Sequence, residues 1–469
     1  METSKRLQFK HFFNFIANLT ILVVQAVAFG YVWYNKYLPY LPKNQQFYRR
    51  GNWAVIGMYI LIVFLFTKSM NGYKIGYLRV TDIILAHVLS IILSGFAGYI
   101  EVSMIVLNVK HKGYLPIRYI AYASLVEIAF VIVWILAVRK LYKLIYPPRQ
   151  MLVIYGNYSP TDLISKINSR KDKYKVCEAV SYDVGYKNLY TMVMNYEAVV
   201  LADLPAEARN QIMKYCFEKG VRTYVTPKIS DILFRGADDI HLFDTPLLLS
   251  RNQGLTLGQR FLKRIFDIVV SLAGIVLASP FMLIIAIAIK LYDRGPVLYK
   301  QERLTIDNKT FWIYKFRSMK IESEQQGARL AAKDDDRITP VGRIIRNIHF
   351  DELPQLFNIL KGDMSMVGPR PERREIADKY TEIVPEFPFR LKVKAGLTGY
   401  AQVYGKYNTT PYDKLKLDIT YIENYSFLLD LKIMFLTFKI LFQKENTEGV
   451  DSEQTNAIKD NRLEKTETD

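Results

Sequence analysis

Four long apolar stretches fill the first third of the chain, at about residues 11–34, 52–67, 82–108 and 116–138. A helix needs about 20 apolar residues to cross the hydrocarbon core of a bilayer, and most of these stretches reach that length. The first begins with basic residues, but it is longer than a signal-peptide core and no small-residue cleavage site follows it. We therefore predict four retained transmembrane helices over residues 1–146.

Basic residues at the ends of these stretches indicate their orientation, because Lys and Arg gather on the cytoplasmic side. They precede the first stretch and follow the fourth, at Lys5, Arg6, Lys10, Arg139, Lys140, Lys143 and Arg149. The first loop argues the other way, with Lys36, Lys43, Arg49 and Arg50. We expect an even number of spans with both ends in the cytoplasm.

The formal net charge of +18 predicts an anionic partner. Nucleic acid, lipid headgroups and phosphorylated substrates all carry such charge, but no nucleic-acid recognition motif is present, so we expect membrane lipids and phosphates. The two cysteines, Cys177 and Cys216, lie far from any metal-binding spacing, and neither a disulfide framework nor a zinc site is expected.

Residues 147–247 alternate between strand and helix patterns. The predicted strands are 151–156, 198–202 and 222–225, with helices near 159–168 and 205–219. This order is typical of a parallel sheet, and we predict a Rossmann-like α/β domain. The glycine-rich phosphate fingerprint is missing from the first turn, which favours a regulatory or oligomerising role over nucleotide binding.

A further apolar run, at residues 261–290, contains Ser279-Pro280. Proline removes a backbone hydrogen bond and bends a helix, so a spanning helix with a kink is one interpretation. The other is a re-entrant helix-break-helix that enters and leaves by the cytoplasmic face. We favour the re-entrant form, because a full crossing would place the polar domain that follows outside the cell.

Basic residues surround one pair of carboxylates between residues 290 and 410. The pair is Asp351-Glu352, and the candidate phosphate-binding residues are Lys315, Arg317, Arg337, Arg346 and Arg370. Arginine forks suit phosphate oxygens in a bidentate way, and lysine acts as a point charge. A diphosphate substrate would need such a cluster.

Two interpretations of Asp351-Glu352 stay open on spacing alone. Asp351 could cap a helix, with Glu352 in the first turn and Pro354 tolerated there. Alternatively, a carboxylate beside a divalent cation and arginines can attack phosphorus and form an acyl phosphate. In that case Asp351 and Glu352 are also the candidate metal ligands.

Residues 260–405 resemble the bacterial sugar transferase family, the polyprenyl-phosphate hexose-1-phosphate transferases. The most specific segment is Asp351-Glu352-Leu353-Pro354-Gln355-Leu356. Others, in the family's order, are Lys263-Arg264-Ile265-Phe266-Asp267, Gly295-Pro296-Val297, Tyr314-Lys315-Phe316-Arg317-Ser318-Met319, Arg337-Ile338-Thr339-Pro340-Val341-Gly342, Met364-Ser365-Met366-Val367-Gly368-Pro369-Arg370-Pro371 and Gly396-Leu397-Thr398-Gly399-Tyr400-Ala401-Gln402-Val403. The N-terminal spans and the α/β domain resemble the large members of the family.

This resemblance implies a role for each matching position. Asp351 would be the nucleophile that takes the sugar phosphate covalently and releases UMP, and Glu352 would bind Mg²⁺ or handle a proton. Lys315, Arg346 and Arg370 would hold phosphates. Ser279-Pro280 would be the break in the re-entrant helix, and Lys263-Arg264 its headgroup anchor. One departure is His349-Phe350, where the family commonly has Ser-Leu or Ser-Ile; a structural histidine is favoured over a substrate contact.

The expected fold class is membrane α plus α/β. It combines a four-helix transmembrane bundle (1–146), the Rossmann-like domain (147–247) and a mixed, mainly α catalytic domain with the re-entrant helix (248–443). A disordered tail (444–469) follows. The resemblance implies a bacterial inner-membrane enzyme that uses a UDP-sugar, a polyprenyl (undecaprenyl) phosphate and Mg²⁺ to start capsule, exopolysaccharide or O-antigen synthesis.

Two other functions were weighed. A nucleotide-sugar dehydratase or epimerase would need a glycine-rich NAD loop, which residues 151–160 lack. A transporter usually has more spans and intramembrane charges, whereas this chain concentrates its charge in a polar block. A scaffold role for the α/β domain and a homodimer both stay open, and the donor sugar, whether glucose, galactose or an N-acetylated hexose, is not readable from the sequence.

Overall fold

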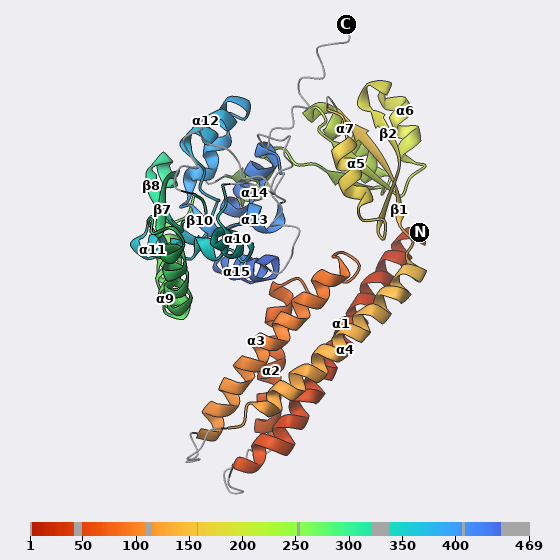
Figure 1. The fold of residues 1–469 in the computed structure, drawn as a ribbon. Coiled ribbons are helices and arrows are strands. Elements are labelled where there is room, and N and C mark those ends of the chain that lie inside the picture. Colours follow the sequence, from red (N-terminus) through yellow and green to blue (C-terminus); the bar gives the residue numbers. More distant parts are fainter. Residues whose placement is uncertain are drawn as a thin grey trace. The chain divides into compact units, whose positions relative to one another are not determined.

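The computed structural model describes residues 2–41, 49–107, 115–156, 158–250, 254–320, 337–405 and 409–441 (Figure 1). The chain divides into two compact units, residues 1–225 and 226–469. The predicted disordered tail, residues 444–469, lies outside the described residues.

Four long helices open the first unit, and they confirm the four apolar stretches as helices. They are α1 (Glu2–Val32), α2 (Arg49–Ser69), α3 (Val80–Leu107) and α4 (Arg118–Ile145). Helix α1 packs against α2 and α4, and α3 packs against the same two helices (Figure 1). All four are long and apolar enough to cross a membrane. They contact one another through aromatic and branched side chains, such as the stacked rings of Phe29 and Tyr59.

A four-stranded parallel sheet follows in the same unit, with the strand order β2-β1-β3-β4. Its elements are β1 (Arg149–Tyr155), α5 (Thr161–Asn168), β2 (Tyr174–Ser181), α6 (Tyr186–Val193), β3 (Ala198–Ala202), α7 (Ala206–Glu218) and β4 (Arg222–Val225). The three predicted strands and the parallel arrangement are confirmed. Strand β2 and helix α6 were missed, because β2 is an edge strand with several exposed residues and little apolar pattern.

The second unit begins with α8 (Ile229–Arg235) and a hairpin of β5 (Asp238–Leu242) and β6 (Thr245–Leu249). Helix α8 packs against α14 (Pro411–Glu423). Part of the segment that we assigned to the α/β domain therefore packs with the second unit.

Helix α9 (Leu257–Asp293) is a fifth helix long and apolar enough to cross a membrane among the described residues. Helical backbone continues on both sides of Pro280, which lies inside the helix, and the predicted break at Ser279-Pro280 stays a prediction. Proline cannot donate to the carbonyl four residues earlier, here that of Val276. The hydroxyl of Ser279 donates to this carbonyl at 2.8 Å and replaces the missing bond. The re-entrant path itself stays a prediction.

The rest of the second unit is mainly helical, with short strands. Its elements are β7 (Leu298–Leu304), β8 (Thr310–Phe316), α10 (Pro340–Asn347), η5 (Phe350–Glu352), α11 (Gln355–Lys361), β9 (Ser365–Val367), α12 (Arg374–Ile383), η6 (Phe387–Lys392), β10 (Gly396–Thr398), α13 (Tyr400–Tyr404), α14 and α15 (Phe427–Leu441). Strands β7 and β8 form an antiparallel hairpin, and β9 pairs in parallel with β10. A buried apolar cluster joins β8, α11, β9 and α15.

Candidate active site

The carboxylate pair lies in η5, the single 3-10 turn between α10 and α11. The turn begins at His349, which has a left-handed backbone with φ of +56°. The residue at the N-cap of α11 is Pro354, and no side chain caps either element. The interpretation of Asp351 as a helix cap is therefore not supported. Among the described residues the structure shows no hydrogen bond to its carboxylate.

Glu352, in contrast, is held by two cations. The Nζ of Lys315 donates to its Oε1 at 2.7 Å, and Nη2 of Arg370 donates to the same oxygen at 2.9 Å. Lys315 comes from β8, and Arg370 follows β9. The fold thus brings together three segments that are far apart in the sequence.

The two adjacent carboxyls are in opposite electrostatic states. Burial raises the pKa of Asp351, and the charge of Glu352 raises it further, against the opposing effects of Lys315, Arg346 and His349. Burial also works against ionisation of Glu352, but Arg370 and Lys315 outweigh it and hold its pKa well below the ordinary range. The site therefore favours the charged form of Glu352, which two cations hold, and leaves Asp351 without a hydrogen bond among the described residues.

Arg346 reaches this site from the last turn of α10, since its charge acts on Asp351. Thr339 starts that helix by accepting a hydrogen bond from the N–H of Gly342 at 2.9 Å. Of the five predicted phosphate-binding residues, the structure therefore gathers Lys315, Arg346 and Arg370 around the dyad.

The other two predicted phosphate-binding residues are placed differently. Arg317 is 7% exposed and forms an ion pair with Asp293, at the end of α9, while its guanidinium fills the space beside Gly295. This gives Arg317 a structural partner in place of a phosphate. Arg337 precedes α10, where its carbonyl accepts a hydrogen bond from the N–H of Lys320.

Lys263 and Arg264, which we predicted to anchor the helix at lipid headgroups, have partners inside the second unit. Lys263 is only 5% exposed, and its Nζ lies 2.5 Å from Oδ2 of Asp430. Arg264 donates to the carbonyls of Ile359 and Leu360 at 2.6 and 2.8 Å. The charge of Lys263 is thus buried and paired inside the unit, whereas Arg264 is only partly buried, and its role as a headgroup anchor stays a prediction.

The analysis of the sequence missed Asp267, one turn after Lys263. Its Oδ1 accepts hydrogen bonds from the N–H of Met366 at 2.9 Å and from the hydroxyl of Ser365 at 3.0 Å. Asp267 thus attaches α9 to β9, just before the segment that carries Arg370. Charged residues four apart in an otherwise apolar run were the signal, since they mark one polar helix face.

The dyad offers oxygens that suit Mg²⁺. This ion is usually bound by one or two carboxylates, with waters and substrate phosphates completing its shell. Oε2 of Glu352 and both carboxylate oxygens of Asp351 have no donor among the described residues. No cluster of three or more His, Cys, Asp or Glu ligands exists in that part of the chain, so a dedicated protein cage is not built there.

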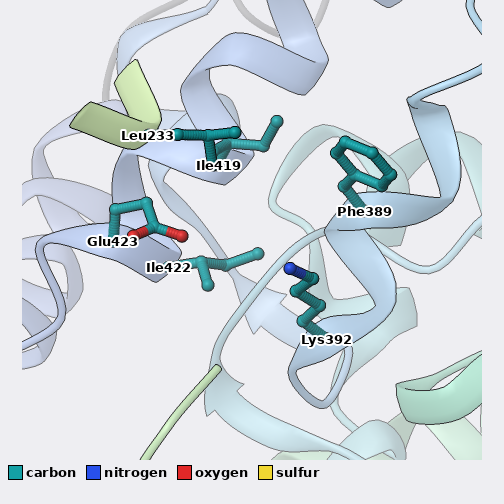
Figure 2. Close-up of a pocket in the computed structure, with 6 residues that line it drawn as sticks. All are labelled: Leu233, Phe389, Lys392, Ile419, Ile422 and Glu423. Carbon is teal, nitrogen blue, oxygen red and sulfur yellow. The ribbon is translucent and has the colours of Figure 1, made fainter. Parts of the chain in front are cut away.

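The dyad lines neither of two cavities that the described residues of the second unit form. The larger, of about 270 Å³, has mostly apolar walls and is lined by Leu233, Phe389, Lys392, Ile419, Ile422 and Glu423 (Figure 2). The smaller, of about 220 Å³, lies against Glu372 and Arg390.

Comparison with known proteins places this site in a family context. The model of the family "Bacterial sugar transferase" matches residues 258–444. A UDP-N-acetylgalactosamine-undecaprenyl-phosphate N-acetylgalactosaminephosphotransferase of Aeromonas hydrophila is 45% identical over 184 residues, covering 39% of this chain and 44% of the relative. A UDP-glucose:undecaprenyl-phosphate glucose-1-phosphate transferase of Klebsiella pneumoniae is 40% identical over 207 residues, 43% of each protein.

A shorter relative is covered almost completely. The uncharacterized sugar transferase EpsL of Bacillus subtilis is 39% identical over 197 residues, which make up 42% of this chain and 93% of the relative. For the two longer relatives the matched part of the chain spans less than half of their length. The residues that the family model matches, 258–444, lie in the second unit and include the dyad.

Proposed function

The chain belongs to the bacterial sugar transferase family, and from this premise we propose that it transfers a hexose-1-phosphate from a UDP-sugar to a polyprenyl phosphate, undecaprenyl phosphate in particular. The products would be UMP and a polyprenyl-diphosphate-sugar. The names of the Aeromonas and Klebsiella relatives support this reaction class. Such a product would start the synthesis of a capsule, an exopolysaccharide or an O-antigen.

One observation carries the proposal most directly. The Asp351 carboxylate is half-buried, caps no helix and accepts no hydrogen bond among the described residues, yet it lies beside a carboxylate that two cations pin. Leaving a partly buried carboxylate unpaired costs free energy, and such costs are typical of functional positions.

We propose a mechanism in two steps for these residues. An oxygen of Asp351 attacks the sugar-bearing phosphorus, the bond from this phosphorus to the bridging oxygen breaks, and UMP leaves with the electron pair. A phosphate oxygen of the polyprenyl phosphate then attacks the same phosphorus and releases Asp351. Lys315, Arg346 and Arg370 offset the charge of the phosphates, and Glu352 orients Lys315 and Arg370. A Mg²⁺ ion bound by Asp351 and Glu352 would neutralise charge between nucleophile and diphosphate.

We also infer how the chain sits in the membrane. Helices α1–α4 would form a transmembrane bundle, and the sheet with its helices a Rossmann-like domain, as the order β2-β1-β3-β4 supports. Helix α9 would be re-entrant, with the catalytic part on the cytoplasmic side of a bacterial inner membrane. Its outward side chains are large and apolar, among them Phe261, Val276, Leu277, Leu283 and Leu291. This surface would hold the dyad next to the phosphate of a membrane-bound lipid.

The test measures UMP release by the purified protein in detergent or nanodiscs, with Mg²⁺ and undecaprenyl phosphate. The donors are UDP-glucose, UDP-galactose, UDP-N-acetylglucosamine and UDP-N-acetylgalactosamine. We expect release with one donor from the wild type and none from Asp351→Asn, whose thermal midpoint shows that it is folded. No release with any donor, or equal release from both proteins, would refute the proposal.

A further inference from the structure

The segment Pro369-Arg370-Pro371-Glu372 has no regular secondary structure, yet each of its carbonyls is held. The N–H of Gly396 donates to Pro369 at 2.9 Å, and the N–H of Leu304 donates to Glu372 at 3.0 Å. Two arginine side chains hold the carbonyls between them. Nη2 of Arg390 donates to the carbonyl of Arg370 at 2.9 Å, and Nη1 of Arg303 donates to that of Pro371 at 3.2 Å.

Arg390 is the most deeply buried of these holders. Its side chain is 2% exposed, and its Nε and Nη2 lie 2.8 and 2.7 Å from Oδ2 of Asp418, which is itself 2% exposed. Its Nη1 lies 3.5 Å from Oε1 of Glu372, which Lys414 also pairs. The charge of the guanidinium is therefore matched by carboxylates, and Nη2 also supports the backbone of Arg370.

Arg370, in contrast, has a side chain that is 43% exposed. An exposed ion pair contributes little free energy and does not by itself hold a long side chain in one place. The contact between Arg370 and Glu352 at 2.9 Å therefore depends on where the backbone of Arg370 is fixed. Buried ion pairs such as Arg390–Asp418 are often no better for stability than apolar residues of similar volume, so stability alone does not explain this one.

We propose that Arg390 is a positioning residue of the active site, which fixes the backbone of Arg370 through its carbonyl and so directs the Arg370 guanidinium at Glu352 and at the donor's diphosphate. This inference rests on the proposed function. It assigns a catalytic consequence to a buried side chain that contacts neither the dyad nor the substrate. A misplacement of about 1 Å in such a group costs about 100-fold in rate.

The test is a double-mutant cycle on kcat/KM for UMP release. The double variant R390M/D418L removes both buried charges at once, which avoids an unpaired charge, and Arg390→Lys keeps the charge but loses the fork. Each is measured with Arg370 intact and with Arg370→Ala, alongside thermal midpoints. We expect a loss of about 100-fold when Arg370 is present and of less than about twofold when it is absent.

A matched control is K263M/D430L, which removes another buried ion pair of the same unit whose partners do not contact residues 369–372. The fold-change in kcat/KM that K263M/D430L causes should be the same, within about twofold, with Arg370 intact and with Arg370→Ala. Equal losses for the Arg390 variants in both backgrounds, or activity within about twofold of wild type, would overturn the inference alone. A wild type that releases no UMP from any donor would overturn the proposed function and this inference with it.

Discussion

At the scale of single residues, the site depends on the contrast between Asp351 and Glu352. They are neighbours in one turn, but Glu352 accepts hydrogen bonds from two cations and Asp351 accepts none among the described residues. Pairs of titratable groups whose pKa values are pushed apart are typical of sites where each group has a separate task. Here Glu352 accepts hydrogen bonds from both cations, and in the proposed mechanism Asp351 is the group that reacts.

This contrast predicts opposite effects on stability at neutral pH. The pKa of Asp351 is raised from 3.8, so folding disfavours its charge, and Asp351→Asn should raise the thermal midpoint at pH 7. The pKa of Glu352 is lowered from 4.5, so folding favours its charge, and Glu352→Gln should lower the midpoint. Calorimetry or a dye-based melt of the two variants would check the signs.

The pH dependence gives the control for this prediction. Because the pKa of Asp351 is raised in the folded protein, its ionisation destabilises the fold, and this cost is complete at pH values above the folded pKa. The increase in the thermal midpoint of Asp351→Asn should therefore vanish as the pH falls below about 3.8, where the carboxyl is protonated in both the folded and the unfolded state. Because the pKa of Glu352 is lowered in the folded protein, its ionisation stabilises the fold at pH values above the pKa that it has in the unfolded state. The decrease in the thermal midpoint of Glu352→Gln should therefore become smaller as the pH falls below about 4.3. A destabilised Asp351→Asn at pH 7 would instead indicate a structural role for this carboxylate.

The acid side of the pH–rate profile should also report Asp351, because Glu352 stays ionised. Arg346 lowers the pKa of Asp351, so Arg346→Met should move the acid limb of kcat/KM to higher pH. Arg343→Met is the matched control, since Arg343 is an exposed residue of the same helix and is not among the groups that act on Asp351. An equal shift in both variants, or none in either, would contradict this placement of Arg346.

At the scale of elements, α9 organises the helix that follows the dyad. Arg264 donates to the last carbonyls of α11, at Ile359 and Leu360, where helices have unsatisfied acceptors and a partial negative charge. Arg264→Met should therefore cost about 1.5–3 kcal/mol of unfolding free energy, the range for hydrogen bonds to charged groups.

Chemical denaturation would measure this cost, with Lys361→Met as the control. Lys361 lies at the end of the same helix, but its side chain is 66% exposed and pairs only at the surface with Asp363. Its loss should stay within about 1 kcal/mol. Equal costs for the two variants would mean that Arg264 does not cap α11.

Features that depend on neighbouring residues could be predicted from the sequence, whereas roles that depend on partners far away in the sequence could not. Apolar length and strand-helix alternation are local, so α1–α4, β1, β3 and β4 were predicted. The roles of Lys263 and Arg317 depend on Asp430 and Asp293, which lie 167 and 24 residues away in the sequence. Without those partners, any basic residue in a motif looks like a ligand for phosphate or lipid. At Ser279-Pro280 the partner is local, since the serine hydroxyl donates to the carbonyl that proline leaves without its usual donor.

The residues of the candidate active site that stand in motifs could be predicted from the sequence, and the buried residues that support them could not. Asp351, Glu352, Lys315, Arg346 and Arg370 stand in motifs, and the fold brings them together. Arg390 and Asp418 stand in none, because they act on the backbone of Arg370 from inside the domain. Buried supports of this kind carry no surface pattern and become visible only when their partners are known.

At the scale of the whole molecule, the candidate site lies in one of the two units. The dyad, its three cations and the residues that fix Arg370 all lie between residues 226 and 469, within the second unit. The family model matches residues 258–444, which also lie within this unit.

We therefore predict that a chain beginning at Thr226 keeps the transfer activity in detergent, with a kcat/KM of the same order as the full chain. Helix α9 stays in this truncated chain and keeps its contacts to β9, α11 and α15, so the dyad retains its support. UMP release by the truncated chain, compared with its own Asp351→Asn variant, would check this. A truncated chain that melts cooperatively but releases no UMP would mean that residues 1–225 complete the active site, and the first unit would then have to be counted as catalytic rather than as a membrane and regulatory attachment.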